Sequence, residues 1–302
     1  MGLLARLRSG EVLVGDGAMG TMLMARGLAA GQCPEALNLG KPEVLAEVAR
    51  LYIEAGADLV ETNTFGGNPI KLALYGLDSK TEEINRKAVE AARSACKAME
   101  ASRSAGKALV LGSVGPTGKL LKPFGDAEPA ALFEAFLRQA KALIEAGADA
   151  VCVETMTDLE EASLAVRAAK TVRPAIPVIA TMTFDKGPKG FFTMMGVGLK
   201  KAVEGLKAAG ADVVGSNCGN GAENMVAIAR EMRGLTDLPL LIQPNAGLPR
   251  LAEGKTVYPE SPDFMAEKAR ELAAAGVAVV GGCCGTAPDH IRAIRRALKP
   301  QL

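Results

Sequence analysis

A short phrase recurs four times along the chain, and it constrains the fold more than any other feature. In each copy a helix-like pattern ends at Ala-Gly, and an apolar, β-branched run follows almost at once. A glycine placed after a helix commonly adopts the left-handed cap conformation, and the β-branched run predicts a strand. The phrase therefore predicts four helix-to-strand junctions. Their cap glycines are Gly56, Gly147, Gly210 and Gly276, separated by roughly two βα units each.

Further apolar runs lie before and between these junctions, and they bring the number of predicted strands to eight. Helical periodicity separates the runs, as in residues 42–53 and 131–144. Eight alternating units in 302 residues predict a single (β/α)8 TIM barrel over residues 1–302. An open doubly wound sheet is the alternative, but no Gly-x-Gly-x-x-Gly turn follows the first strand. We predict the strands at about 12–15, 58–63, 108–113, 149–154, 177–182, 212–217, 239–243 and 277–282.

Composition excludes several classes of partner. Lys and Arg number 35 against 34 Asp and Glu, so no electrostatic footprint for nucleic acid or an anionic membrane is expected. No apolar run reaches the ~18 residues of a membrane span. The segment 1–8 is too short and too interrupted for a signal peptide, so we expect a cytoplasmic protein. Six cysteines in such a protein favour metal binding or catalysis, wherever they cluster, over disulfides.

Three of the cysteines fall where a barrel would bring them together. Cys283 and Cys284 lie in the glycine-rich segment 281–286 at the end of the eighth predicted strand, and Cys218 ends the sixth. Alternate strands of a barrel contribute side chains to the same layer, so these three sulfurs can meet at the C-terminal face. Three thiolates suit zinc, and a fourth position left open is typical of a catalytic site. The alternative is that all three are small buried residues, which leaves the flanking glycines unexplained.

A zinc ion held by three thiolates is a weak Lewis acid, which suits one type of chemistry. It is poorly suited to making hydroxide, but it can hold an incoming thiol as a nucleophilic thiolate at neutral pH. The chemistry indicated is therefore S-alkylation of a bound thiol. The other cysteines, Cys33, Cys96 and Cys152, lack such a setting and are interpreted as packing residues.

Several sequence segments, taken together and in order, resemble the homocysteine S-methyltransferase (homocysteine-binding) domain family, in the branch of cobalamin-dependent methionine synthase. The resemblance covers residue ~12 to the end of the chain. The matching segments are Gly15–Thr21, Cys33–Asn38, Glu61–Gly66, Gly112–Gly118, Glu154–Thr155, Asn217–Cys218, Gln243–Gly247 and Gly281–Thr286.

The resemblance implies a zinc barrel whose metal ligands match Cys218, Cys283 and Cys284, beside a pocket for an amino acid. In that pocket Glu154 would face the substrate ammonium, with Asp16 beside it. Backbone amides of Gly17, Ala18 and Met19 would receive the carboxylate. Asn245 matches a family residue next to zinc. The alternative for the two acids is that they are hydrogen-bonded loop carboxylates.

The function implied is methylation of homocysteine, activated as a zinc thiolate, from methylcobalamin to give methionine. The one histidine, His290, lies outside an Asp-x-His-x-x-Gly motif and is interpreted as a helix-capping residue, so the corrinoid must come from a separate protein or module. Residues 180–182, 192–197 and 219–221 depart from the usual family text. These segments are expected to line the barrel mouth, so the acceptor or the donor can differ from the usual one.

Two alternatives therefore stay open. One is a corrinoid-dependent catabolic methyltransferase that acts on another methylated small molecule or a related small thiol. The other is a thiol-binding barrel that docks onto a corrinoid module without turnover. The presence of Asp16, Glu154 and all three thiols argues against the second.

Overall fold

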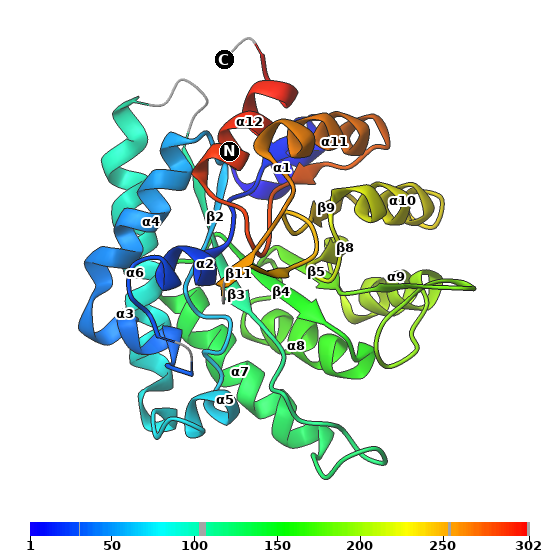
Figure 1. The fold of residues 1–302 in the computed structure, drawn as a ribbon. Coiled ribbons are helices and arrows are strands. Elements are labelled where there is room, and N and C mark those ends of the chain that lie inside the picture. Colours follow the sequence, from blue (N-terminus) through cyan, green and yellow to red (C-terminus); the bar gives the residue numbers. More distant parts are fainter. Residues whose placement is uncertain (30, 103–106, 253–254, 301–302) are drawn as a thin grey trace.

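The computed structural model describes residues 1–302 except residues 30, 103–106, 253–254 and 301–302. Its central sheet has eight parallel strands, and helices surround it (Figure 1). Every predicted barrel strand is present, and the (β/α)8 prediction is confirmed. In chain order the strands are β1 (Leu13–Val14), β2 (Leu59–Glu61), β3 (Leu109–Val114), β4 (Ala150–Met156), β5 (Val178–Met182), β8 (Val213–Asn217), β9 (Leu240–Gln243) and β12 (Val279–Val280).

The main helices are amphipathic and place one apolar face against the strands. The predicted helices at 42–53 and 131–144 are α4 (Pro42–Glu54) and α7 (Pro129–Glu145). The other helices are α1 (Leu3–Arg8), α2 (Met19–Met24), α3 (Leu37–Gly40), α5 (Pro69–Ala73), α6 (Thr81–Met99), α8 (Leu159–Val172), α9 (Leu199–Ala209), α10 (Ala222–Arg233), α11 (Pro262–Ala274) and α12 (Pro288–Leu298), with 3-10 turns η1 (Pro34–Ala36), η2 (Asp78–Lys80) and η3 (Glu100–Ser102).

The repeated phrase has a second structural role besides its glycine cap. All four cap glycines have positive φ, between 82° and 104°. In three copies an aspartate follows the cap, and its carboxylate accepts the backbone N–H of the preceding barrel strand. The pairs are Asp58 with Val14, Asp149 with Val110, and Asp212 with Val178. Each aspartate amide also donates to the carbonyl of the same strand residue. We call these three aspartates the latch aspartates.

The Asp58 latch also closes the barrel. The strand ladder runs from β1 through β12 and round to β2, and the gap between β1 and β2 is bridged by Asp58. Its amide donates to Val14 O at 2.7 Å, and its Oδ2 accepts from Val14 N at 3.0 Å. Arg6, Arg295 and Lys299 surround this buried carboxylate, so both ends of the chain meet there.

One end of the barrel is filled and the other is open. Leu3 and Leu7 of α1 pack with the apolar inward residues of the strands, such as Leu59 and Leu241. The sequence analysis did not predict α1. This helix plugs the N-terminal end of the barrel, and the C-terminal ends of the strands, where barrel enzymes place their sites, border a cavity.

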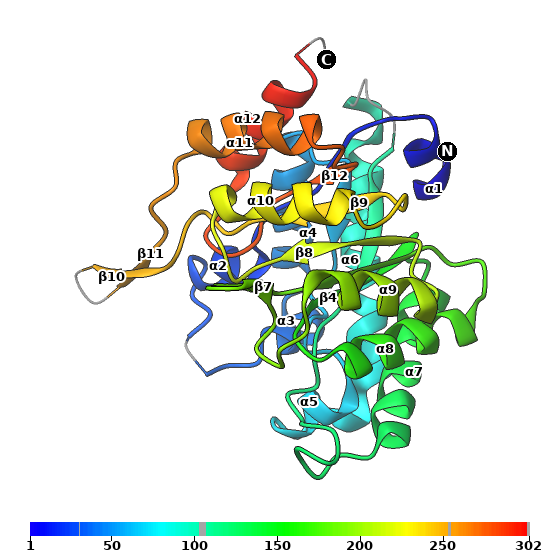
Figure 2. The same ribbon diagram turned by 90° about the vertical axis from the view of Figure 1, so that its right-hand side faces the viewer.

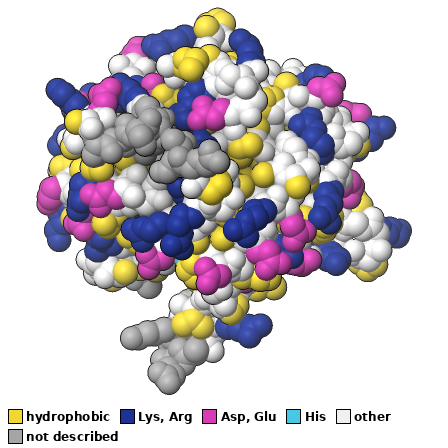
Figure 3. Space-filling model, turned by 90° about the horizontal axis from the view of Figure 1, so that it is seen from above, with side chains coloured by type: hydrophobic (Ala, Val, Ile, Leu, Met, Phe, Trp, Pro, Cys, Tyr) yellow, Lys and Arg dark blue, Asp and Glu magenta, His cyan; other side chains and the backbone are white. Residues whose placement is uncertain are grey.

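Two hairpins extend the loops at the open end. One joins β6 (Asp185–Gly187) to β7 (Gly190–Phe192), and the other joins β10 (Arg250–Ala252) to β11 (Lys255–Val257). The second projects away from the barrel on the side of α2 (Figure 2). On the face seen in Figure 3, basic and acidic side chains are interspersed. Among the described helices, none combines the length and apolarity of a membrane span.

Candidate metal and substrate site

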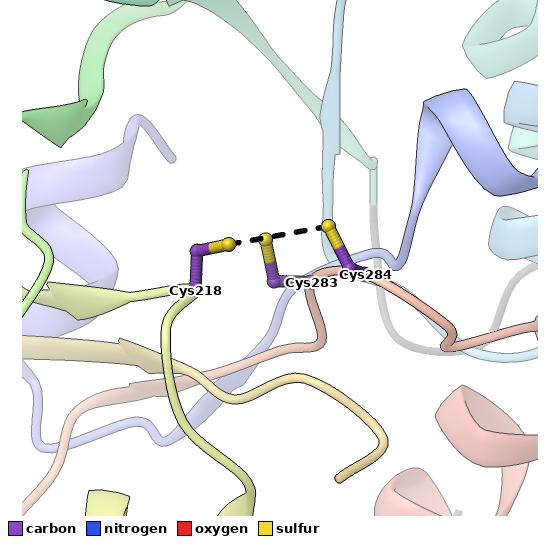
Figure 4. A group of neighbouring side chains, drawn as sticks. All are labelled: Cys218, Cys283 and Cys284. Carbon is purple, nitrogen blue, oxygen red and sulfur yellow. Dashed lines mark hydrogen bonds between the residues drawn. The ribbon is translucent and has the colours of Figure 1, made fainter. Parts of the chain in front are cut away.

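The three predicted thiols meet at the open end of the barrel. Cys218 follows β8, and Cys283 and Cys284 follow β12 (Figure 4). Their sulfur atoms all lie within 4.8 Å of one another, and Cys218 Sγ is 3.9 Å from Cys284 Sγ. All three side chains are half-buried. The prediction that strands six and eight bring these sulfurs together is confirmed.

The local backbone explains the glycines around the thiols. Cys218 has a φ of 60°, which is uncommon outside glycine, and Gly219 continues the turn with a φ of 72°. The Cys218 amide donates to Gln243 O and the Cys283 amide to Pro244 O, so both loops are tied to the end of β9. A Cβ on Gly282 would lie 2.5 Å from the Thr286 hydroxyl, so only glycine fits there.

A cavity of about 340 Å³ opens beside the thiols. Its wall contains the three cysteines, the loop Gly17–Thr21 and three acidic residues, of which Glu61 and Glu154 lie at strand ends. No Lys or Arg lines it among the residues that the structure describes. The remaining lining residues are Met24, Pro34, Glu35, Thr62, Asn63, Phe65, Ser113, Thr155, Gln243, Tyr258 and Gly282.

Comparisons with known proteins agree with this geometry. The sequence profile of the family described as homocysteine S-methyltransferase matches residues 13–298. The chain belongs to this family. Methionine synthase of Mycobacterium tuberculosis is 38% identical over 301 residues, which is 96% of this chain and 25% of that protein. Methionine synthase of Mycobacterium leprae is also 38% identical, over 95% of this chain and 24% of that protein.

Solved structures give the same assignment. The metallated form of the homocysteine methyltransferase MmuM from Escherichia coli superposes with a TM-score of 0.81 at 29% identity, covering 96% of this chain and 98% of that one. Its oxidized form gives 0.78 at 30% identity, covering 94% and 95%. The chain thus spans about a quarter of the length of the curated relatives, but nearly all of the MmuM chain.

In this member of the homocysteine S-methyltransferase family, the spacing of the three thiols Cys218, Cys283 and Cys284 fits a tetrahedral metal ion. Sulfurs bound to one zinc at ~2.3 Å lie about 3.8 Å apart, close to the 3.9 Å between Cys218 and Cys284. Hydrogen bonds from Cys283 and then Cys284 lower the pKa of Cys218 to about 3, while the contact with Cys218 raises the pKa of Cys284 to about 11. Three thiols at this spacing therefore favour a thiolate at Cys218.

Asn245 supports the same interpretation. Its side chain is one of the groups that lower the pKa of Cys218, and its Oδ1 is buried without a hydrogen-bond partner among the described atoms. A buried amide oxygen without a partner is costly unless a ligand or ion meets it. Asn245 does not line the cavity, so it lies beside the thiols and not against the amino-acid part of the pocket.

Glu154 lies where the sequence predicts, at the end of β4 and on the cavity wall. Its carboxylate accepts hydrogen bonds from Ser113 Oγ and from Asn217 Nδ2, the latter at 3.2 Å. Burial, together with the charge of Glu61, raises the pKa of Glu154 well above its usual value. A buried acid in that state favours a cation beside it.

Asp16 is buried, and its Oδ2 accepts the Glu61 amide at 2.8 Å. Its side chain is not among those that line the cavity, and its place beside Glu154 in the substrate pocket stays a prediction. Within the loop Gly17–Met19, the Ala18 amide already donates to Thr286 Oγ1 at 3.1 Å. The amides of Gly17 and Met19 therefore remain the candidates for a carboxylate. No residue of 180–182, 192–197 or 219–221 lines the cavity, so the departures from the family text lie outside it.

Sequence reasoning missed Asn217 and Glu61. Asn217 joins the two halves of the site: its Nδ2 contacts Glu154 and, at 3.8 Å, Cys283 Sγ, and its Oδ1 accepts from the Thr155 amide at 2.8 Å. The period of two along a strand would have found both, because Leu59 and Val213 point into the barrel, and Glu61 two residues after Leu59 and Asn217 four residues after Val213 lie on the same face. The inward polar layer above the apolar core is Glu61, Ser113, Glu154, Thr181, Asn217 and Gln243.

The remaining cysteines and the histidine follow the predictions. Cys96 and Cys152 are buried within α6 and β4, and Cys33 is buried at the start of η1, where its thiol contacts Glu35. His290 lies in the first turn of α12, and its Nδ1 accepts the Ala287 amide at 3.1 Å. It is the predicted capping residue.

Proposed function

We propose that this protein transfers a methyl group from a corrinoid to the sulfur of homocysteine, giving methionine, with zinc bound by Cys218, Cys283 and Cys284. The observation that carries the proposal is that three converging thiols and a buried acidic group lie on the wall of one cavity. The thiols suit a substrate sulfur and the acids suit an ammonium group, and homocysteine carries both.

Zinc bound by the three thiolates would supply one effect: it stabilises the thiolate form of the substrate sulfur at neutral pH. Residues of the chain bind and align the substrate. Glu154 binds the ammonium, and the amides of Gly17 and Met19 bind the carboxylate. Asn217 holds Glu154 and Cys283 in a fixed relation, so the amino acid and its sulfur are aligned together.

The methyl donor is proposed to be a methylcorrinoid presented by a separate protein or module. The cavity of about 340 Å³ holds an amino acid but is small for a corrin ring. The Mycobacterium relatives named methionine synthase are about four times as long as this chain, which leaves room in them for further modules. A catabolic methyltransferase acting on another methylated compound is the competing function. Its main sequence support, the departing segments, lies outside the cavity.

The test is an assay of the zinc-loaded protein with homocysteine and free methylcobalamin. We expect methionine to form, and Cys283→Ser to lower the rate at least ~100-fold, because loss of a ligand exceeds the effect of changing an outer residue. Cys96→Ser, a matched change of a buried cysteine in α6, should leave the rate unchanged.

Two results would contradict the proposal. Absence of homocysteine binding to the zinc-loaded protein would exclude homocysteine as the acceptor. Transfer of a methyl group from another methylated compound to cob(I)alamin, with no methionine formed, would instead support the catabolic alternative.

A further inference from the structure

A short segment, Tyr258–Glu260, contacts both loops that carry the thiols. It lies between β11 and α11, and two glycines make room for it. A Cβ on Gly285, in the loop after β12, would lie 2.1 Å from the Tyr258 ring, and a Cβ on Gly221, in the loop after β8, would lie 2.2 Å from Glu260 Oε1. Glycine is therefore required at both places by the close approach of this segment. We call it the 258–260 segment.

The side chain of Glu260 holds the loop that carries Cys218. Its Oε2 accepts the backbone amide of Ala222 at 3.0 Å, at the first residue of α10. A carboxylate is favourable there because the first amides of a helix have no partner within the helix. Between the two residues, the Asn220 amide donates to Cys218 O at 2.8 Å, and Asn220 O accepts the Asn245 amide at 3.0 Å. Glu260 therefore fixes the far end of the turn that begins at Cys218.

The backbone of Glu260 holds the other thiol loop through two hydrogen bonds. Its amide donates to Ala246 O at 2.9 Å, and the Ala246 amide donates in turn to Cys284 O at 2.9 Å. Its carbonyl oxygen lies 3.1 Å from His290 Nε2. Because His290 Nδ1 accepts the Ala287 amide, the proton of the neutral ring lies on Nε2, which donates to Glu260 O. His290 thus joins the 258–260 segment to the first turn of α12, directly beyond the Cys284 loop.

We propose that Glu260 and His290 are positioning residues for the metal, which hold the Cys218 loop and the Cys284 loop at the spacing that binds one zinc ion. Both act through the backbone of the loops and not as ligands. The sulfurs of Cys218 and Cys284 lie 3.9 Å apart, and a metal site needs its ligands held within about 0.5 Å of the productive geometry. Release of either loop should therefore weaken the site. This inference rests on the proposed function, because it takes zinc as the ion bound by the thiols.

The test measures the zinc Kd of folded variants by competition with a coloured chelator, under reducing conditions. Glu260→Ala removes the acceptor for the Ala222 amide. We expect it to raise the zinc Kd roughly 10- to 100-fold, the loss typical of an outer residue that orients metal ligands. Glu260→Gln keeps an oxygen that can accept the same amide, so its Kd should change less than about threefold.

His290→Asn distinguishes positioning from helix capping. The amide oxygen that it introduces stands as many bonds from the backbone as His290 Nδ1 and can still accept the Ala287 amide, but no atom replaces Nε2. We expect its zinc Kd to rise about 10-fold, whereas a residue that only caps α12 would leave the Kd unchanged. Absorption spectra of the Co²⁺-loaded proteins give a second measurement, because their bands depend on the number and geometry of the bound thiolates. The bands should shift or weaken in Glu260→Ala and His290→Asn.

The matched control is Asp158→Ala. Asp158 precedes α8, and its Oδ1 accepts the Glu160 amide at 2.7 Å, so this change also removes a carboxylate from the N-terminus of a helix. It follows β4, which carries none of the three thiols of the site. Its zinc Kd should equal that of the unchanged protein. Urea unfolding in chelator measures the stability of each variant, which distinguishes a general loss of stability from a loss of zinc affinity.

The outcomes separate this inference from the proposed function. An unchanged zinc Kd and cobalt spectrum in Glu260→Ala and His290→Asn overturn the positioning role, while zinc binding by the thiols stands. A Kd raised as much in Asp158→Ala also overturns it, because stability and not loop spacing would then set the affinity. If Glu260→Ala does not fold, His290→Asn decides by the same measurements. Absence of zinc binding by the unchanged protein overturns the proposed function and this inference with it.

Discussion

At the scale of single residues, the site concentrates groups that the free protein holds at a cost. Thr155 and Cys218 have positive φ values of 58° and 60°, and Asn245 Oδ1 has no hydrogen-bond partner among the described atoms. Burial also raises the pKa values of Asp16, Glu61 and Glu154. Strain and unpaired groups that collect at one place are typical of a functional site, where a ligand supplies the missing partners.

The raised pKa of Glu154 makes the stability of the free protein depend on pH. In the unfolded chain this group titrates near 4.3, and in the folded protein its pKa is higher. Its contribution to stability is therefore complete below the unfolded pKa and is lost as pH rises through the folded pKa. Glu154→Gln cannot ionise and avoids that loss.

We therefore expect the unfolding free energy of Glu154→Gln, relative to the unchanged protein, to increase between about pH 5 and about pH 8. Urea unfolding of both proteins in chelator at the two pH values measures it. The thiols are common to both proteins and cancel in the difference. A difference that is the same at both pH values would show that Glu154 ionises without a cost in the folded protein.

At the scale of secondary-structure elements, the latch aspartates join the second, fourth and sixth barrel strands (β2, β4 and β8) each to the strand before it. The three differ in their surroundings. The side chain of Asp58 is 0% exposed and contacts Arg6, Arg295 and Lys299, whereas those of Asp149 and Asp212 are 24% and 28% exposed and each pair with one cation. The fourth copy has Ala278 in this place and uses only its backbone amide.

This difference predicts a ranking of stability losses. Asp58→Asn keeps the hydrogen bond to Val14 N but leaves three cations around a neutral group, so we expect a loss of about 3–5 kcal/mol. Asp149→Asn and Asp212→Asn should each cost about 1 kcal/mol, because solvent screens their ion pairs. Urea unfolding of the three variants gives the comparison. Equal losses at all three positions would mean that the latch hydrogen bond, and not the buried charge cluster, dominates.

The same elements show what could be predicted from the sequence. The eight strands were predictable because each junction is local: Gly56 and Gly147 end a helix, and a β-branched run follows within a few residues. The convergence of Cys218, Cys283 and Cys284 was predictable from the order of the strands alone. The plug α1 was not predicted, because it is only six residues long and its place is set by the contact of Leu3 and Leu7 with the barrel floor. The hydrogen bond from the Glu61 amide to Asp16 was not predictable either, because it joins residues 45 positions apart in the sequence.

At the scale of the whole molecule, the contacts that hold the barrel together lie apart from the three thiols. The plug at the N-terminal end, the latch aspartates and the inward apolar layer involve none of the three thiols. The loops that carry the thiols are fixed to β9 by backbone hydrogen bonds from Cys218 and Cys283. Zinc is therefore expected to bind a folded barrel and to stabilise it, without being required for folding.

Measurements with and without zinc can distinguish a barrel that folds without metal from a fold that requires it. With zinc at a thousand times its Kd, the unfolding free energy should rise by ~4.1 kcal/mol, because zinc binds the folded state in preference to the unfolded one. Cys284→Ser should remove most of that gain, and Cys96→Ser should keep it. Circular dichroism in chelator should show unchanged secondary structure for all three proteins, while urea unfolding shows the stability difference. Loss of helix and strand signal on chelation would instead mean that the thiol loops, and not the apolar layer and the plug, hold the barrel together.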